Sequence, residues 1–335
     1  MPFTHILGQD MAISTLTRAL TSGRVHHAYR FEGPPGVGKE MTATALAQAL
    51  VCVGDDPLGC GACSACQRAA GRSPGRPASP LHPDVAIVAR NFYPAATIGR
   101  KTDESSEISV DQVRTIVLQH ASYPAHEGRA RVFLVRDADE LSTGAANALL
   151  KTLEEPRQGT YFVLLTSRPD ALLNTIRSRT MPVRFGPLPE AVVRDALEAA
   201  EIPAERQELA LEMAGGSVSA ALELCDEEAT EAREAFVRRV FEAVDARDLG
   251  MAVTLAESLE KDKDRLKADL RALGAALARR ARGEVDEAPA SAEVLARRYE
   301  AVGRAVVRLE RNASPQLAMV SLVADLREAG RYCVP

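Results

Sequence analysis

The sequence predicts an α/β domain built on a parallel sheet, followed by a region made of helices alone. Gly33 to Lys39 reads G-x-x-x-x-G-K, the frame of a phosphate-binding loop, and lies between a short apolar run and a helix-like run. As far as Gly186, further apolar runs alternate with segments of helical periodicity, the pattern of parallel strands joined by helices. From Pro187 onward no strand-like run occurs, and Ala, Glu, Arg and Leu recur at helical spacing.

Length and composition limit the class of protein. A chain of 335 residues should hold two or three domains, because single cores rarely exceed ~250 residues. The sequence has no run of ~18 apolar residues and no signal-peptide pattern at its start, so we expect a cytoplasmic protein without a membrane partner. A net charge of −5 and the absence of Trp argue against a basic nucleic-acid-binding protein that acts alone.

Two helices and a pair of histidines precede the phosphate-binding loop. Residues 4–23 show apolar residues at helical spacing, and Gly23 is expected to end this segment. His26 and His27 then lead into the first strand, where neighbouring side chains face opposite sides of the sheet. We therefore expect packing or turn roles for the two histidines, and not a shared metal ion.

The phosphate-binding loop keeps its shape-forming residues but loses a metal ligand. Gly33, Gly36 and Gly38 permit backbone angles that turn successive N–H groups inward, and Lys39 would place an ammonium beside the outer phosphates. The next position should carry a Ser or Thr hydroxyl for Mg²⁺, but it is Glu40, whose carboxylate would repel a triphosphate. The loop is therefore expected to be present in a degenerate form.

Four of the six cysteines are clustered in the sequence, whereas Cys225 and Cys333 are isolated. The cluster has the spacing C-x7-C-x2-C-x2-C on a Gly-rich turn and consists of Cys52, Cys60, Cys63 and Cys66. In a reducing cytoplasm a disulfide framework is not expected, but four thiolates at this spacing can hold one tetrahedral Zn²⁺. With four protein ligands the predicted zinc site is structural; unligated or redox-active thiols are the alternative.

A basic insertion follows the cysteines. Residues 71–83 are dense in Pro, Gly, Ser and Arg, which predicts a loop without a core of its own. The stretch 68–101 holds a single acid, Asp84, and six basic residues: Arg68, Arg72, Arg76, Arg90, Arg100 and Lys101. We expect a solvated, mobile insertion, and a patch that contacts phosphates is the alternative.

Three more strands and two helices complete the expected sheet domain. The strands are predicted at residues 85–88, 132–135 and 161–165, and the helices at residues 108–122 and 143–155. In such a parallel sheet, ligands bind at the carboxyl ends of the strands.

The end of the strand at 132–135 departs from an ATPase pattern. An ATPase of this architecture should have Asp-Glu here, the aspartate for Mg²⁺ and the glutamate to activate water. This chain has Arg136 and Asp137 instead. A cation stands where the metal-holding anion belongs, so a second part of the hydrolytic site is missing.

The C-terminal half is expected to hold a small helical unit, which runs to about Cys225, and then a helical bundle with a linker at 283–290. Ser314 and Pro315 are typical of the N-cap and first residue of a last helix. Two apolar seams predict the bundle core or a subunit contact: Leu266, Leu270, Leu273 and Leu277, and Leu295, Tyr299, Val302, Val306 and Leu309.

Several motifs together resemble the clamp-loader subunits of bacterial DNA polymerase III, and among them the delta-prime type. They span nearly the whole chain and include Asn-Ala-Leu-Leu-Lys-Thr-Leu-Glu-Glu-Pro at residues 147–156. The others are the phosphate-binding loop, the four cysteines, His-His-Ala-Tyr at 26–29, His-Pro-Asp at 82–84, Ile-Arg-Ser-Arg at 176–179 and Asn-Ala-Ser-Pro-Gln-Leu at 312–317.

This resemblance implies a fold of three parts and a set of partners. The parts are an AAA+ α/β domain at 1–186 with an inserted zinc module at about 52–66, a small helical lid domain at 187–240, and an all-α collar domain at 241–335. The implied partners are gamma/tau motor subunits and a delta subunit in a five-membered ring. That ring loads the sliding clamp onto primed DNA during DNA replication, using ATP bound between subunits.

The resemblance also assigns a role to Arg179. The family motif Ser-Arg-Cys presents an arginine to the γ-phosphate of a neighbouring subunit's nucleotide, and here Ser178-Arg179-Thr180 differs only at the last residue. Arg179 is therefore expected to be catalytic in trans, because a planar, permanently charged guanidinium suits the charge on a transferring phosphoryl group. A surface ion pair is the alternative reading of this residue.

Three departures from the family pattern fall on this chain's own nucleotide site. Besides Glu40 and Arg136, the family motif Gly-Ser-x-Arg reads Gly-Ser-Val-Ser at 216–219, so the arginine that would contact the nucleotide in cis is absent. We expect Zn²⁺ as a structural cofactor, weak or no nucleotide binding and no independent ATPase activity, which is the delta-prime pattern.

Two other functions compete with this one. An ATP-hydrolysing subunit of the gamma/tau type is opposed by the three departures and by the lack of an extended C-terminal tail. A zinc-stabilised nucleic-acid-binding module acting alone is opposed by net charge and by the low aromatic content of 4%.

Overall fold

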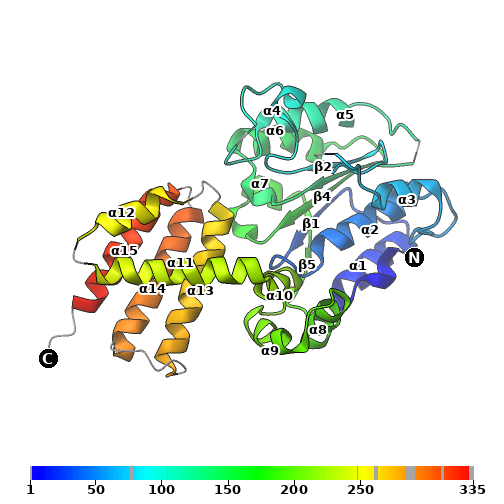
Figure 1. The fold of residues 1–335 in the computed structure, drawn as a ribbon. Coiled ribbons are helices and arrows are strands. Elements are labelled where there is room, and N and C mark those ends of the chain that lie inside the picture. Colours follow the sequence, from blue (N-terminus) through cyan, green and yellow to red (C-terminus); the bar gives the residue numbers. More distant parts are fainter. Residues whose placement is uncertain are drawn as a thin grey trace. The chain divides into compact units, whose positions relative to one another are not determined.

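The computed structural model divides the chain into two compact units, Met1–Cys225 and Asp226–Pro335 (Figure 1). The described residues are 2–75, 78–103, 105–127, 129–246, 248–259, 263–283, 291–310 and 313–331. Some predicted features lie outside them: Arg76, Cys333, Asn312 and residues 284–290 of the expected linker.

The first unit contains a five-stranded parallel sheet with the strand order β2-β3-β4-β1-β5. Its strands are β1 (Ala28–Glu32), β2 (Val85–Val88), β3 (Arg131–Val135), β4 (Thr160–Thr166) and β5 (Met181–Arg184). The predicted strands at 85–88, 132–135 and 161–165 are therefore confirmed. The edge strand β5 was not predicted, because of its four residues only Val183 is buried and Pro182 interrupts the pattern.

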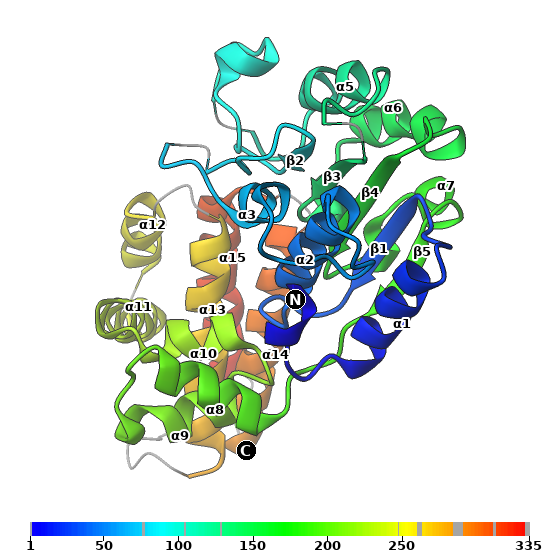
Figure 2. The same ribbon diagram turned by 90° about the vertical axis from the view of Figure 1, so that its right-hand side faces the viewer.

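Helices cover both faces of the sheet, and the strands divide their side chains between two cores (Figure 2). In β3, Leu134 packs with Leu16 and Leu46 on one face, whereas Phe133 packs with Leu149 on the other. This alternation follows from the two-residue period of a strand, and burial of both faces explains the continuous apolar run.

The helices of the sheet region agree closely with expectation. They are η1 (Pro2–His5, 3-10), α1 (Asp10–Thr21), α2 (Lys39–Val51), α3 (Ser64–Ala70), η2 (Ala95–Ile98, 3-10), α4 (Val110–Gln112), the π-helical stretch η3 (Val113–Leu118), α5 (Gln119–Ala121), η4 (Ala138–Glu140, 3-10), α6 (Thr143–Glu154), η5 (Pro169–Ala171, 3-10) and α7 (Asn174–Arg177). The helix predicted at 108–122 thus occurs, with a π-helical middle. The helix predicted at 143–155 ends one residue earlier.

Three helices after the sheet belong to the first unit: α8 (Glu190–Ala199), α9 (Ala204–Met213) and α10 (Val218–Cys225). Their apolar residues, including Leu197 and Ala221, share the core of α1 and α2. The small helical unit expected to end near Cys225 therefore packs with the sheet. The division into separate domains at 1–186, 187–240 and 241–335 stays a prediction.

The described residues of the second unit form helices joined by turns and contain no strand; the helices are α11 (Glu227–Asp245), α12 (Gly250–Glu257), α13 (Lys263–Ala281), α14 (Ala292–Glu310) and α15 (Pro315–Arg331). The four leucines of the first predicted seam are buried in its core. In the second seam Tyr299 is 55% exposed, so it does not belong to the core of this unit. No helix among the described residues is long and apolar enough to cross a bilayer.

Candidate functional site

The phosphate-binding loop lies between β1 and α2, at the carboxyl end of β1, as its sequence predicts. Gly36 and Gly38 have φ of 71° and 93°, a left-handed conformation that favours glycine. Gly36 also lacks room for a side chain, because a Cβ atom there would lie 2.1 Å from Oγ of Ser219. The glycines therefore permit both the turn of the loop and the close approach of residues 217–219.

The Lys39 side chain turns back onto its own loop. Its ammonium donates hydrogen bonds to the carbonyl oxygens of Gly33 and Pro34, each at 2.5 Å. Burial lowers the pKa of Lys39, and the nearby carboxylates of Asp137 and Asp139 oppose that shift. The ammonium expected beside the outer phosphates thus has its hydrogen-bond partners inside the protein.

The two residues that break the ATPase pattern contact each other. Glu40 is in the first turn of α2 and Arg136 directly follows β3, and Oε1 of Glu40 forms an ion pair with Nη2 of Arg136. The Arg136 guanidinium also lies over the ring of Phe92, 5.5 Å from its centroid. The opposite charges of these two substitutions at one site were a signal of the contact in the sequence, although neither residue by itself predicts its partner.

Residues 216–219 cover the loop from α10. The backbone N–H of Val218 donates to the carbonyl oxygen of Gly36 at 3.1 Å, and the hydroxyls of Ser217 and Ser219 lie 3.3 Å apart. Ser219, which occupies the position expected for a cis arginine, is thus a small residue packed against Gly36. At position 219, where the family motif has an arginine, this chain therefore has a close contact between the start of α10 and the loop.

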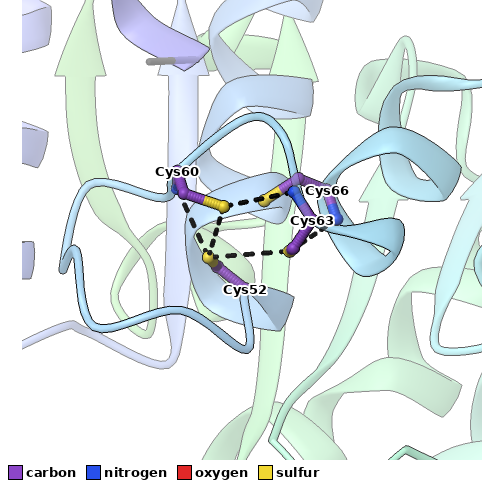
Figure 3. A group of neighbouring side chains, drawn as sticks. All are labelled: Cys52, Cys60, Cys63 and Cys66. Atoms are coloured by element: carbon purple, nitrogen blue, oxygen red, sulfur yellow. Dashed lines mark hydrogen bonds between the residues drawn. The ribbon is translucent and has the colours of Figure 1, made fainter.

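The four clustered cysteines come together at one end of α2 (Figure 3). Their sulfur atoms all lie within 4.8 Å of one another, and Sγ of Cys52 is 3.6 Å from that of Cys60 and 3.9 Å from that of Cys63. Zn–S bonds of ~2.3 Å in a tetrahedral site place sulfur atoms about 3.8 Å apart. The donor set and spacing therefore fit Zn²⁺.

Local backbone groups prepare the cysteines for this role. Although burial opposes the change, hydrogen bonds from the backbone N–H groups of Cys66 and Val53 lower the pKa of Cys63 to about 6. Burial raises the pKa of Cys66, whose thiol is fully buried. A bound cation would stabilise the Cys66 thiolate, because metal binding and thiol deprotonation are linked.

Arg179 lies at the amino-terminal ends of the strands, whereas the phosphate-binding loop lies at their carboxyl ends. It follows α7 and precedes β5, whereas the loop follows β1, which is parallel to β5. Its Nη2 forms an ion pair with Oε1 of Glu154 at 2.5 Å, and its Nη1 donates to the carbonyl of Thr175 at 2.9 Å. In this chain alone Arg179 is thus in a surface ion pair, the alternative considered from sequence.

An open pocket of about 620 Å³ surrounds this arginine. It is lined by His26, His27, Leu153, Glu154, Ser178, Arg179, Thr180 and Met181. Residues 26–27 precede β1, residues 153–154 end α6, and residues 178–181 lead into β5. The pocket therefore lies at the amino-terminal ends of the strands. It contains the Arg179 guanidinium and its ion-pair partner Glu154 beside apolar side chains.

We expected the two histidines to face opposite sides of the sheet, but they do not. They precede β1, and their rings stack with centroids 4.4 Å apart. Nε2 of His27 is hydrogen-bonded to the carbonyl oxygen of Leu153 at 2.9 Å, and Nδ1 of His26 lies 2.8 Å from the carbonyl oxygen of Ala28. The expected packing role fits these contacts, but the geometric reason given for it was wrong.

Several of the described basic residues in the insertion bind groups of this chain. Arg68 forms a two-bond ion pair with Glu127 at 2.5 and 2.7 Å, and Arg90 pairs with Glu140 at 3.0 Å. Arg72 donates to three carbonyl oxygens at residues 69–71 and to the Thr44 hydroxyl. The described part of the insertion therefore has contacts with its neighbours, although much of its stretch at 71–83 is exposed, and its mobility stays a prediction.

A buried polar network next to the insertion was missed as a structural feature. Asp84 accepts hydrogen bonds from the backbone N–H groups of His126 and Glu127 at 2.6 and 2.8 Å and from Nη2 of Arg131 at 2.8 Å. Buried His82 lies beside it, with Nε2 3.3 Å from Glu127. The motif His-Pro-Asp at 82–84 was its only signal in the sequence.

Comparison with known proteins places this geometry in a family. A family model described as DNA polymerase III, delta subunit matches residues 8–189. The DNA polymerase III subunit gamma/tau of Mycobacterium bovis is 35% identical over 196 residues, which cover 58% of this chain and 30% of that protein. The subunit delta' of Haemophilus influenzae is 34% identical over 241 residues, 71% of this chain and 64% of that protein.

A solved structure of a gamma subunit-related protein from Thermotoga maritima covers 96% of this chain with a TM-score of 0.49 and 17% identity. The chain spans about a third of the length of the Mycobacterium bovis gamma/tau subunit and about two thirds of the length of the Haemophilus influenzae delta' subunit. The family match covers more than half of the chain, includes the phosphate-binding loop, the cysteines and Arg179, and confirms the resemblance to clamp-loader subunits. The chain therefore belongs to the family of the DNA polymerase III delta subunit and has the AAA+ type of α/β fold.

Proposed function

We propose that the chain is a delta-prime-type clamp-loader subunit, which does not hydrolyse ATP itself and supplies Arg179 to the nucleotide of a neighbouring subunit. The observation that carries this proposal is the position of Arg179 at the amino-terminal ends of the strands, opposite the phosphate-binding loop. The length of β1 therefore separates Arg179 from this chain's own loop. A nucleotide that it contacts would belong to another subunit.

The state of the loop supports the other half of the proposal. Glu40 and Arg136 pair with each other, and Ser219 packs against Gly36. At these three positions the chain therefore lacks the loop hydroxyl (Glu40 instead), the acid after the strand (Arg136 instead) and the cis arginine (Ser219 instead) that Mg²⁺ and a triphosphate need. The chain is thus suited to a fixed role beside active ATPase subunits.

The proposed partners follow from the family. They are gamma/tau-type motor subunits and a delta subunit in a five-membered ring, with the sliding clamp and primed DNA bound by the assembled complex. Such a protein would work in the cytoplasm. The Cys52–Cys66 cluster would hold structural Zn²⁺, which fits the sulfur positions.

A second candidate is an ATP-hydrolysing subunit of the gamma/tau type, since several gamma/tau proteins are as similar in sequence as the delta' proteins. The Glu40–Arg136 ion pair argues against it, because it occupies the two positions that would hold the metal.

The proposal is tested by Arg179→Ala in the reconstituted complex with clamp and primed DNA. We expect normal folding and assembly but a several-fold slower steady-state ATPase and clamp loading. The full effect of a decisive trans arginine is ~10³ to 10⁵, but other subunits' sites would continue to turn over. Arg194→Ala, which removes an exposed partner of Glu190, is the matched control. Equal ATPase and loading rates for the Arg179→Ala and unaltered complexes would contradict the proposal.

A further inference from the structure

The contact between Glu40 and Arg136 joins two elements that are far apart in the sequence. Glu40 lies in the first turn of α2, immediately after the phosphate-binding loop, and Arg136 directly follows β3, so the ion pair joins residues that are 96 positions apart in the sequence. The side chains are 45% and 29% exposed, which places the pair at the rim of the site and partly out of solvent. Both residues differ from the ATPase pattern, and each supplies the partner that the other needs.

Other groups hold the Arg136 end of the pair in place. The guanidinium lies over the Phe92 ring, and the backbone N–H of Arg136 donates to the carbonyl oxygen of Val88 at 2.9 Å. Arg72 follows the cysteine module in the sequence. Burial lowers the pKa of Arg72, and the nearby carboxylate of Glu40 raises it. Glu40 therefore lies in the field of two guanidinium groups.

The remainder of the loop is also held by contacts within the chain. Besides the bonds of Lys39 and of Val218 described above, Nε2 of Gln9 donates to the carbonyl oxygen of Val37 at 3.1 Å and to that of Gly186 at 2.8 Å. These contacts tie the loop to the start of α1, to the end of the sheet region and to α10. Several groups of the loop thus have partners within the chain.

In a P-loop ATPase, Mg²⁺ links these same two positions, because it is held by the loop hydroxyl and by the acid after the strand. We propose that the Glu40–Arg136 ion pair replaces this metal link, so that α2 and β3 are joined, and the loop keeps one conformation, without nucleotide or Mg²⁺. In the ATPase, two ligands are joined through a cation. Here the carboxylate and the guanidinium carry opposite charges and contact each other directly. This role is independent of Arg179 and of any partner subunit.

A double-mutant cycle on the full chain tests the link. Glu40→Gln keeps the side-chain length and Arg136→Gln shortens it, but each leaves a charged partner unpaired, so each should lower the thermal midpoint of the first unit by about 2–4 °C. The double variant should lose no more than the worse single variant, since the interaction can be lost only once. The matched control is Glu190→Gln with Arg194→Gln on α8, an exposed pair whose two effects should be small and additive. Additive losses at Glu40 and Arg136 overturn the proposal.

A gain-of-function variant tests the replacement of the metal. Glu40→Thr with Arg136→Asp restores a hydroxyl and an acid, so Mg²⁺ and ATP together should raise its thermal midpoint, and Mg²⁺ alone should not. The unaltered chain should show no rise, and adding Lys39→Ala to the rebuilt variant should abolish it. Chelators are left out because they would remove zinc from the cysteine cluster. An equal rise in the unaltered chain, or none in the rebuilt variant, overturns the proposal.

Discussion

At the residue scale, single side chains of the sheet unit are explained by the partners they find within the chain. Arg179 pairs with Glu154, and Lys39 binds carbonyl oxygens of its own loop. Their residue types and positions could be predicted from motifs, because glycine, lysine and arginine at those spacings have a defined chemistry. Their partners could not, because Glu154 and Arg179 meet only after α6 and α7 are packed together.

His82 offers a test of one buried residue through pH. Burial lowers the pKa of His82 below the ordinary 6.5. As the pH falls below about 6.5, His82 is therefore protonated in the unfolded chain before it is protonated in the folded chain. The stability that depends on neutral His82 is thus present above about pH 6.5 and is lost as the pH falls towards the lowered folded value. We expect His82→Gln to reduce the fall in thermal midpoint between pH 7.5 and pH 5.5.

The comparison between variants isolates His82 and the two carboxylates that interact with it, Asp84 and Glu127, because the cysteine cluster and the other carboxylates titrate alike in both proteins. His120→Gln, at an exposed position of the same unit, is the control and should leave the pH dependence unchanged. An identical fall in the unaltered chain and in His82→Gln would show that the buried imidazole does not govern acid sensitivity here.

At the scale of elements, sequence periodicity predicted the interior strands and the long helices because they are buried on a regular face. Strand β5 was missed because an edge strand with one buried residue has no period. At Tyr299 the seam does not form the bundle core, because α14 buries Ala301 and Ala305 beside Val302 and leaves Tyr299 exposed; a subunit contact there stays a prediction. Small residues carry little apolar signal, although they permit close packing of helices.

The cysteine cluster links α2 to α3, so metal removal should be felt at both elements. Cys52 directly follows α2, and Cys63 caps α3 by accepting a hydrogen bond from the backbone N–H of Cys66. We expect one Zn²⁺ per chain by elemental analysis. Cys63→Ala should lower this content and increase protease sensitivity near residues 52–70, because metal binding there contributes to folding.

Cys225→Ala is the matched control, because this isolated cysteine lies in α10 away from the cluster. It should keep its zinc. Well under one zinc per freshly purified unaltered chain would refute the assignment of a structural metal centre.

At the scale of the whole molecule, the AAA+ fold and the family could be predicted because several motifs occur together in a fixed order. The division into parts was harder to predict. Apolar residues of α8, α9 and α10 share a core with α1 and α2, and no change of composition marks that contact. The site was read as a set of losses, and only the packed structure reveals that Glu40, Arg136 and Ser219 make contacts of their own.

The last prediction concerns the purified chain on its own, which should hydrolyse no ATP above background. Mg²⁺ has neither its loop hydroxyl nor its acid, since those positions are Glu40 and Arg136, and Lys39 is bound to its own loop. Steady-state phosphate release should be measured with and without Lys39→Ala, which removes the ammonium that an active loop needs. Turnover that survives the substitution would come from a contaminating ATPase. Turnover that the substitution abolishes would mean that this loop is catalytic, and the chain would then be an ATPase subunit of the gamma/tau type.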